Sequence, residues 1–290
     1  MLAGGVAAAA ILVAVVIALF GGGGDGRSGA GRAGGAGRSL GHAVGRGAAP
    51  RGPAGRRVRA RVAEDRAIRR VLRYTPYITR GGKRRKVVAL TFDDGPGPQT
   101  PELMRELRHL RAPATFFQVA QMIHVYPQVA RREREQGFAI GGHTISHPDL
   151  ATLRPGAQRR EIGGGTQAIE QTSRFYPRLF RPPYGAYDDA TLRELRRRGM
   201  LMVLWTVSTR DYDQPGVGAI VKTAVKGARP GAIILMHDAG GATRTETLRA
   251  VPRIVRGLRR RGFKLVTVPR MLLVSPPRGK PARPPSPYPG

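Results

Sequence analysis

The chain has 290 residues, of which 50 are Lys or Arg and 19 are Asp or Glu, and it carries a formal charge of +31 at pH 7. At roughly 100 to 200 residues per domain, this length suits one good-sized domain with appendages, or two small ones. The chain contains no Cys, which excludes a disulfide scaffold, a thiolate metal site and a cysteine nucleophile. Any metal must therefore be held by His and carboxylate side chains.

The chain begins with an apolar run, residues 2–20, that is long enough to span a bilayer. No basic residue precedes the run, and Ala18-Leu19-Phe20 is a poor cleavage site for a signal peptide. We therefore predict a single-pass membrane anchor with the rest of the protein outside the cytoplasm, and the alternative is a cleaved segment of a secreted protein. The Arg-rich sequence after the run conflicts with the positive-inside rule.

Residues 21–56 consist mainly of Gly, Ala, Arg and Ser without apolar periodicity, which predicts a flexible tether. The tether has no aromatic residue for base stacking, so nucleic acid is disfavoured as a partner. Anionic cell-wall polymers or lipid headgroups suit its positive charge better. Residues 57–85 form a basic lead-in, and the apolar spacing within 57–73 predicts a solvated, basic helix.

From residue 86, short apolar runs alternate with longer amphipathic stretches, which indicates strand–helix units and a mostly parallel sheet. The last such stretch, 245–261, has the apolar spacing of a one-sided helix. About seven units within 86–274 predict a small, distorted or incomplete (β/α) barrel, followed by a Pro-rich disordered tail at 275–290. The expected strands are 87–92, 114–117, 138–141, 178–180, 201–207, 232–236 and 264–268.

Polar residues gather at the ends of these strands, where (β/α) barrels carry their chemistry. Asp93 and Asp94 end the first strand in a Gly/Pro turn and are expected to face different ways, although such a sequence alone is most often only a tight turn. His143 and His147 follow the third strand, and Pro148 favours a loop over a helix there. Two His and a carboxylate from another strand end suit a three-ligand metal site with open positions.

Two further strand ends carry candidate catalytic groups. Arg181, fixed by the Pro pair that follows it, could hold and orient a carboxylate base, and His237 could act as an acid from the opposite rim. Each signal is weak by itself, because Arg-Pro-Pro is a common loop and a His after an apolar strand can simply cap it. Their order and placement together carry the interpretation.

In this order the motifs resemble the polysaccharide deacetylase family, the family 4 carbohydrate esterases with a NodB homology domain, over roughly residues 86–270. The resemblance implies that Asp93 is the general base and that Asp94, His143 and His147 bind the metal. It implies a divalent cofactor, Zn²⁺ in the first place, with Co²⁺, Ni²⁺ or Mn²⁺ as alternatives. His237 would be the general acid.

The resemblance also assigns supporting roles. Arg181 would steady the base, the backbone N–H of Tyr184 would help form an oxyanion hole, and Leu235 would line the acetyl pocket. The fourth motif departs from the family pattern Asp-x-x-Asp-Trp, because Ser208 and Tyr212 replace its first Asp and its Trp. The second Asp, Asp211, is retained and is expected to pair with His237.

The single Trp of the chain, Trp205, is a candidate wall of the acetyl pocket, and a core role is an equal alternative. The function implied is that of a metal-dependent hydrolase acting on linear amide bonds, which removes N-acetyl groups from a cell-surface polysaccharide. Peptidoglycan, through N-acetylglucosamine or N-acetylmuramic acid, is the preferred substrate, and chitin-type glycans stay open. The sequence also leaves open an O-acetyl esterase on xylan-like glycans, a catalytically silent carbohydrate-binding module, and a scaffold acting through the basic tether.

Overall fold

The structure is a computed structural model, and it describes residues 52–279. The expected membrane segment at 2–20, nearly all of the tether and most of the Pro-rich tail lie outside the described residues. Within the described part, no helix is long and apolar enough to cross a membrane.

The strands of the described residues form one curled sheet in which every paired strand is parallel to its neighbour. Its order is β1-β6-β5-β4-β3-β2-β8-β7, and β9 pairs with the start of β2. The strands are β1 Tyr77–Ile78, β2 Val87–Asp93, β3 Ala114–Gln118, β4 Ala139–Gly142, β5 Leu179–Phe180, β6 Leu201–Val203, β7 Val207–Ser208, β8 Ala232–His237 and β9 Lys264–Leu265.

The expected strand 201–207 is two strands, and the residues between them link the two edges of the sheet. β6 pairs with β5 and β1 at one edge of the sheet, whereas β7 pairs with β8 at the other edge. Between them, the N–H of Leu204 donates to the carbonyl of Ile78, and the N–H of Thr206 donates to that of Ile233. One stretch of chain thus joins both edges, and the architecture is the incomplete (β/α) barrel that the sequence predicts.

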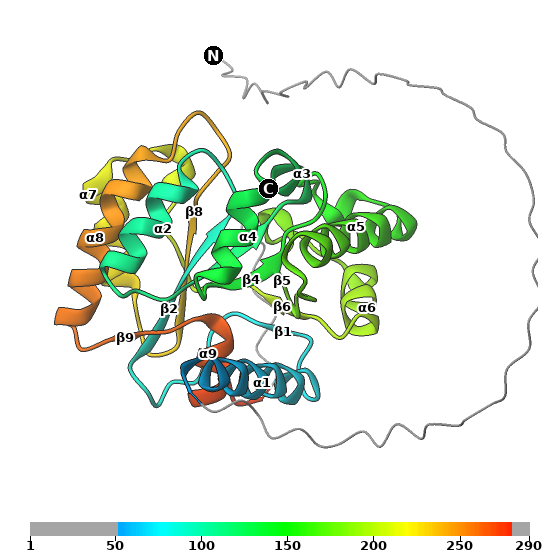
Figure 1. Ribbon diagram of the computed structural model, residues 1–290, viewed down its shortest axis with the longest axis horizontal. Helices are drawn as coiled ribbons and strands as arrows, with labels where there is room; N and C mark the ends of the chain where they lie inside the picture. The colour runs from blue at the N-terminus through cyan, green and yellow to red at the C-terminus, as the bar shows by residue number, and fades with distance from the viewer. Residues whose placement is uncertain (1–51, 280–290) are drawn as a thin grey trace, which may run out of the picture. The chain divides into compact units, whose positions relative to one another are not determined.

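Helices surround the sheet, with α2, α7 and α8 on one side and α3 to α6 on the other in Figure 1. The apolar face expected for 245–261 is that of α8, where Val251, Ile254, Val255 and Leu258 are fully buried. The helices are α1 Pro53–Leu72, α2 Thr100–His109, α3 Ala120–Val125, α4 Pro127–Glu135, α5 Pro155–Ser173, α6 Asp189–Arg197, α7 Val217–Gly227, α8 Thr245–Arg260 and α9 Val268–Val274.

Side-chain alternation along β2 separates the outer layer from the barrel interior. Leu90 and Phe92 pack against the surrounding helices in an outer cluster, which includes Leu107 of α2 and Ile254 of α8. Ala89 packs inside the barrel in an inner cluster, which includes Phe117, Leu179, Leu201 and Ile233 of the other strands. Thr91 and Asp93 continue the inner row, because both contact the same buried Arg side chain. The alternation therefore directs Asp93 into the barrel.

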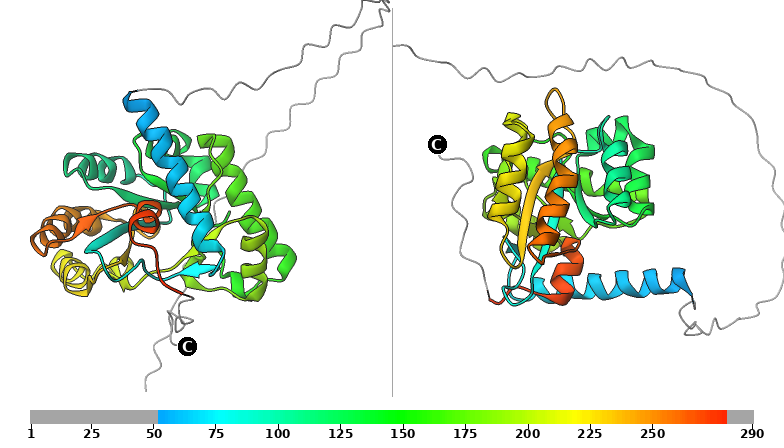
Figure 2. Two further views of the ribbon diagram at one scale, coloured as in Figure 1. Left: turned by 90° about the horizontal axis from the view of Figure 1, so that it is seen from below. Right: turned by 90° about the vertical axis from the view of Figure 1, so that its left-hand side faces the viewer.

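The lead-in helix and the last helix close one end of the barrel, which differs from the sequence expectation of a solvated helix. Ala67, Ile68 and Val71 of α1 pack in the inner cluster with Met271 and Leu272 of α9. Figure 2 shows α1 lying across this end, with its first half extending beyond the barrel. Only that first half matches the expected solvated surface.

Three other boundaries differ from the sequence expectations. α1 begins at Pro53, inside the expected tether, because Pro favours the first turn of a helix. β1 lies before the expected domain start at residue 86, and a two-residue strand is too short to show periodicity. The expected strand 264–268 ends at Leu265, because α9 begins at Val268 with Thr267 as its N-cap.

Candidate active site

The parallel strands bring the polar residues expected at strand ends to one rim of the barrel. Asp93 ends β2 and lies in register with His237, which ends the adjacent strand β8. His237 therefore stands beside Asp93, not at the opposite rim that the sequence led us to expect. His143 directly follows β4, and Arg181 directly follows β5. These four side chains, far apart in the sequence, therefore start from the same edge of the sheet.

Asp93 and Arg181 form a buried ion pair inside the barrel. Nη1 of Arg181 donates to Oδ1 of Asp93 at 2.6 Å and to the hydroxyl of Thr91 at 2.9 Å, and Nε donates to the carbonyl of Val203 at 2.9 Å. The guanidinium carbon lies 4.2 Å from the ring centre of Phe117. Burial lowers the pKa of Arg181, and the charge of Asp93 opposes this shift. Such a pair fixes the orientation of the carboxylate.

Asp94 turns away from the strand and faces the two histidines. Its φ is 74°, in the left-handed region that few non-Gly residues adopt. Its Oδ1 lies 3.5 Å from Nε2 of His143 and 3.1 Å from Nε2 of His147. These three residues offer ligand atoms within 4.8 Å of one another, the arrangement expected of a metal site.

The chemistry of these donors fits a divalent cation. Oδ1 of Asp94 is buried and makes no hydrogen bond. Nδ1 of His143 lies 2.6 Å from the carbonyl oxygen of Arg181, which can only accept, so Nδ1 carries the proton and Nε2 keeps its lone pair. Two imidazoles and one carboxylate are a common ligand set for Zn²⁺ with open positions for water and substrate.

The pKa of Asp94 is held well below its usual value, although burial alone would raise it. The imidazoles of His143 and His147, together with the charge of His237, favour the charged form and outweigh the effect of burial. This carboxylate is therefore charged at neutral pH, as a metal ligand must be. Asp93 pairs with Arg181, whereas Asp94 faces the two histidines.

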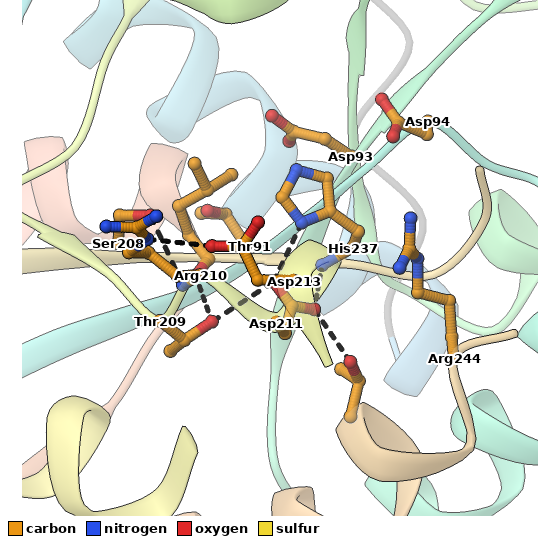
Figure 3. A network of polar contacts seen from close by, with 12 residues as sticks. Thr91, Asp93, Asp94, Ser208, Thr209, Arg210, Asp211, Asp213, His237 and Arg244 are labelled. Carbon is orange, nitrogen blue, oxygen red and sulfur yellow. Dashed lines mark hydrogen bonds and ion pairs between the residues drawn. The ribbon is translucent and has the colours of Figure 1, made fainter. Parts of the chain in front are cut away.

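His237 is held by Asp211 on the side away from Asp93 and Asp94, as Figure 3 shows. Its Nδ1 lies 2.8 Å from Oδ1 of Asp211, and its backbone N–H donates to Oδ2 of the same carboxylate at 2.8 Å. The hydroxyl of Thr247 donates to Oδ2 at 2.7 Å, and that of Thr209 donates to Oδ1 at 3.1 Å. A fully bonded, buried carboxylate of this kind orients the imidazole and favours its protonated form.

The remaining predicted residues lie around the rim. Tyr184 has a φ of 59°, and its ring centre lies 4.7 Å from that of His147. Tyr212 stands edge to face with His237 at 5.5 Å, on the other side of the site. Leu235 is buried in β8 two residues before His237. Trp205 is half-buried and packs against two core clusters, with the Arg181 guanidinium 5.6 Å from its ring centre.

The structure adds polar residues that the motifs did not identify. Thr209 and Thr247 complete the hydrogen bonds of Asp211, and Thr247 lies on α8, where nothing in the sequence marks it. Asp238, next to His237, is buried beneath the turn after Asp94, and a Cβ at Gly95 would collide with its carboxylate. Burial, opposed by the Thr100 hydrogen bond and reinforced by the charges of Asp94 and Asp93, raises the pKa of Asp238 to about 7.

Comparison with known proteins shows which family the chain belongs to. Residues 80–203 match the family model described as polysaccharide deacetylase. A peptidoglycan-N-acetylglucosamine deacetylase of Bacillus cereus is 35% identical over 209 residues, which cover 71% of this chain and 97% of that protein. The chain belongs to the polysaccharide deacetylase family.

Other members extend the range of substrates. A chitooligosaccharide deacetylase of a Bradyrhizobium species is 35% identical over 196 residues, covering 63% of this chain and 90% of that protein. The crystal structure of the Bc1960 peptidoglycan N-acetylglucosamine deacetylase superposes with a TM-score of 0.67 at 30% identity, covering 72% of this chain and 97% of that one. The chain is accordingly a polysaccharide deacetylase, and its relatives are named for two kinds of N-acetylated glycan.

Proposed function

We propose that this deacetylase removes N-acetyl groups from cell-wall peptidoglycan, with Asp93 as general base and His237 as general acid. One observation carries the proposal: Asp94, His143 and His147 converge on one point, with Asp93 and His237 in register on adjacent strands beside it. Amide hydrolysis requires a base for the attacking water and an acid for the departing amine, and these two side chains can supply them.

The chain's own residues divide the proton transfers between them. Asp93, oriented by Arg181, accepts a proton from the attacking water. His237, protonated beside Asp211, donates a proton to the departing amine, which is otherwise a poor leaving group. The products are acetate and a free amino sugar. The backbone N–H of Tyr184 is proposed to stabilise the developing oxyanion.

Asp94, His143 and His147 would hold a divalent cation, with Zn²⁺ as the proposed metal. When bound, such a cation lowers the pKa of water toward about 7 and polarises a carbonyl group. The rest of the site then has only to orient the acetyl group and to move protons. Leu235 is proposed to line the acetyl pocket, and Tyr212 to contact the sugar.

Charge supports peptidoglycan over neutral chitin-type glycans. The chain carries a formal charge of +31, and peptidoglycan with its attached polymers is anionic. We further propose that residues 2–20 anchor the enzyme in the cell membrane, with its catalytic domain outside the cytoplasm. The basic tether would then contact anionic wall polymers or headgroups.

The proposal is tested by acetate release from purified peptidoglycan, a chitooligosaccharide and acetylated xylan, each with and without a chelator. We expect release from peptidoglycan that the chelator abolishes and added Zn²⁺ restores. Asp93→Asn is expected to lower the rate about 100-fold to 10,000-fold while the protein still binds metal. Acetate release that is unaffected by the chelator, or full activity of the Asp93 variant, would contradict the mechanism. Acetate release from xylan alone would favour the esterase alternative.

A further inference from the structure

The loop that carries the two metal-site histidines adopts an unfavourable backbone conformation. Thr144 has a φ of 72° and His147 a φ of 63°, both in the left-handed region. Non-Gly residues stay in this region only where the surroundings hold them there. The contacts that hold residues 143–147 therefore decide where the His147 imidazole lies.

One side of this loop is held by α3. The first two N–H groups of that helix, those of Ala120 and Gln121, donate to the carbonyls of Thr144 and Ile145, both at 3.0 Å. Within the loop, the N–H of His147 donates to the hydroxyl of Thr144 at 3.0 Å. These bonds satisfy the carbonyl groups but leave the N–H groups of Ile145 and Ser146 to another partner.

That partner is the carboxylate of Glu161 on α5. Its Oε2 accepts from the N–H of Ile145 at 2.9 Å and from the N–H of Ser146 at 3.0 Å, and its Oε1 accepts from the hydroxyl of Ser146 at 2.9 Å. One side chain thus binds two consecutive backbone amides immediately before His147. Hydrogen bonds to an ionised acceptor are the stronger kind.

The sequence of α5 allows the helix to lie directly against this loop. Gly163, Gly164 and Gly165 stand in succession in the helix interior, where Gly is unfavourable relative to Ala. A Cβ at Gly165 would lie 2.7 Å from the carbonyl oxygen of Thr144, closer than side chains approach. Gly164 and Gly165, which face Ile145 and Thr144, therefore let the helix bring Glu161 within reach of the loop.

We propose that Glu161 is a positioning residue of the metal site, which holds His147 against Asp94 by fixing the Ile145 and Ser146 amides. The inference rests on the proposed function in so far as it takes this site to bind metal. Without the carboxylate, the strained loop would relax, and the 3.1 Å approach of His147 Nε2 to Asp94 would be lost for part of the time.

The test measures the affinity for Zn²⁺ of three metal-free, full-length proteins: the wild type, Glu161→Gln and Glu170→Gln. The affinity is determined by competition with a chromophoric chelator. Glu170 is the matched control, because it lies on the same helix, is exposed and loses the same charge. We expect the Glu161 variant to bind Zn²⁺ about 10-fold to 100-fold more weakly, the range for residues that orient metal ligands. Equal affinities in the two variants would overturn the inference.

Hydrogen exchange in the metal-free proteins supplies a second measurement. The segment 143–148 should exchange faster in Glu161→Gln than in the wild type or in Glu170→Gln, and unchanged exchange would overturn the inference. If Glu161→Gln fails to fold, Ser146→Ala takes its place, because it removes only the hydroxyl contact with Glu161. This variant should show weaker Zn²⁺ binding and faster exchange, both to a smaller degree. The absence of both effects in Ser146→Ala would overturn the inference. A wild type that binds no Zn²⁺ would end the proposed function, whereas the exchange measurement would still decide whether Glu161 holds the loop.

Discussion

Asp93 and Asp94 are adjacent in the chain, yet the shortest ion-pair contact of each carboxylate is to a different side chain, Arg181 for Asp93 and His147 for Asp94. The last inward position of β2 places Asp93 against Arg181, and the positive φ of the next residue turns Asp94 toward the histidines. His237 has its own partner in Asp211. The general acid proposed here therefore has a partner of its own, separate from the groups that orient Asp93 and Asp94.

Replacing Asp211 by Asn should shift the pH dependence of the enzyme. Burial alone would lower the pKa of His237, but the hydrogen bond and charge of Asp211, with the charges of Asp94 and Asp93, raise it to about 9. A general acid must be protonated, so activity is lost as the pH rises through this pKa. Asp211→Asn should therefore move the alkaline limb of kcat/KM to lower pH, by roughly 1 to 3 units.

Asp213→Asn is the control for this pH profile. Asp213 follows Asp211 by two residues, but it is exposed and pairs with Arg210 at the surface. Its removal should leave the alkaline limb in place. An unchanged limb in the Asp211 variant would show that the pair does not set the protonation of His237.

At the scale of elements, α1 and α9 close the barrel end opposite the catalytic rim. The two helices come from the two ends of the described chain and pack together with residues of the inner cluster. They supply the apolar surface that buries the inward side chains at the start of the strands, such as Val87. We therefore expect α1 to contribute to the stability of the domain through its second half only.

Two substitutions on α1 test this division. Ile68→Ala removes a side chain that is 5% exposed, and it should lower the free energy of unfolding by about 2–5 kcal/mol. Val58 is 50% exposed on the same helix, and Val58→Ala should change stability by less than about 0.5 kcal/mol. Denaturant unfolding measures both. Similar small effects would mean that α1 does not close the barrel in solution.

At the scale of the whole molecule, negative charge is concentrated at the site, whereas the chain as a whole is positively charged. Acidic residues gather at the catalytic rim, where Figure 3 shows Asp93, Asp94 and Asp211 around His237. The carboxylate of Asp238 lies beneath Gly95, near Asp94 and Asp93. The chain as a whole is strongly basic, with 50 Lys or Arg against 19 Asp or Glu. Long-range attraction of an anionic polymer must therefore come from outside the site.

This distribution predicts a salt effect that depends on the substrate. Raising the salt concentration from about 0.05 to about 0.5 M screens charges separated by more than a few ångströms. We expect KM for anionic peptidoglycan to rise several-fold, and KM for a neutral chitooligosaccharide to change little. Steady-state acetate release with both substrates measures this, and an equal change for both would show that the basic charge does not attract the substrate.

The sequence by itself indicated the class of fold and the side chains that gather at one rim of it. Strand–helix alternation indicated a parallel barrel, and polar residues after each apolar run indicated which side chains meet at its rim, because parallel strands end at one edge. Asp93, Asp94 and His143 were identified in this way, since each ends or directly follows its strand, and His147 was identified in the loop that follows β4.

Only the tertiary structure decided the contacts between segments that no local pattern links. Thr247 on α8 and Glu161 on α5 reach the site from helices, where a polar residue looks like any solvated position. The strand expected at 201–207 divides because its two halves pair with opposite edges of the sheet, and α1 is half-buried because α9 meets it. Strand pairing and burial depend on partners that are distant in the sequence. The periodicity within one segment therefore cannot predict which partners that segment will have.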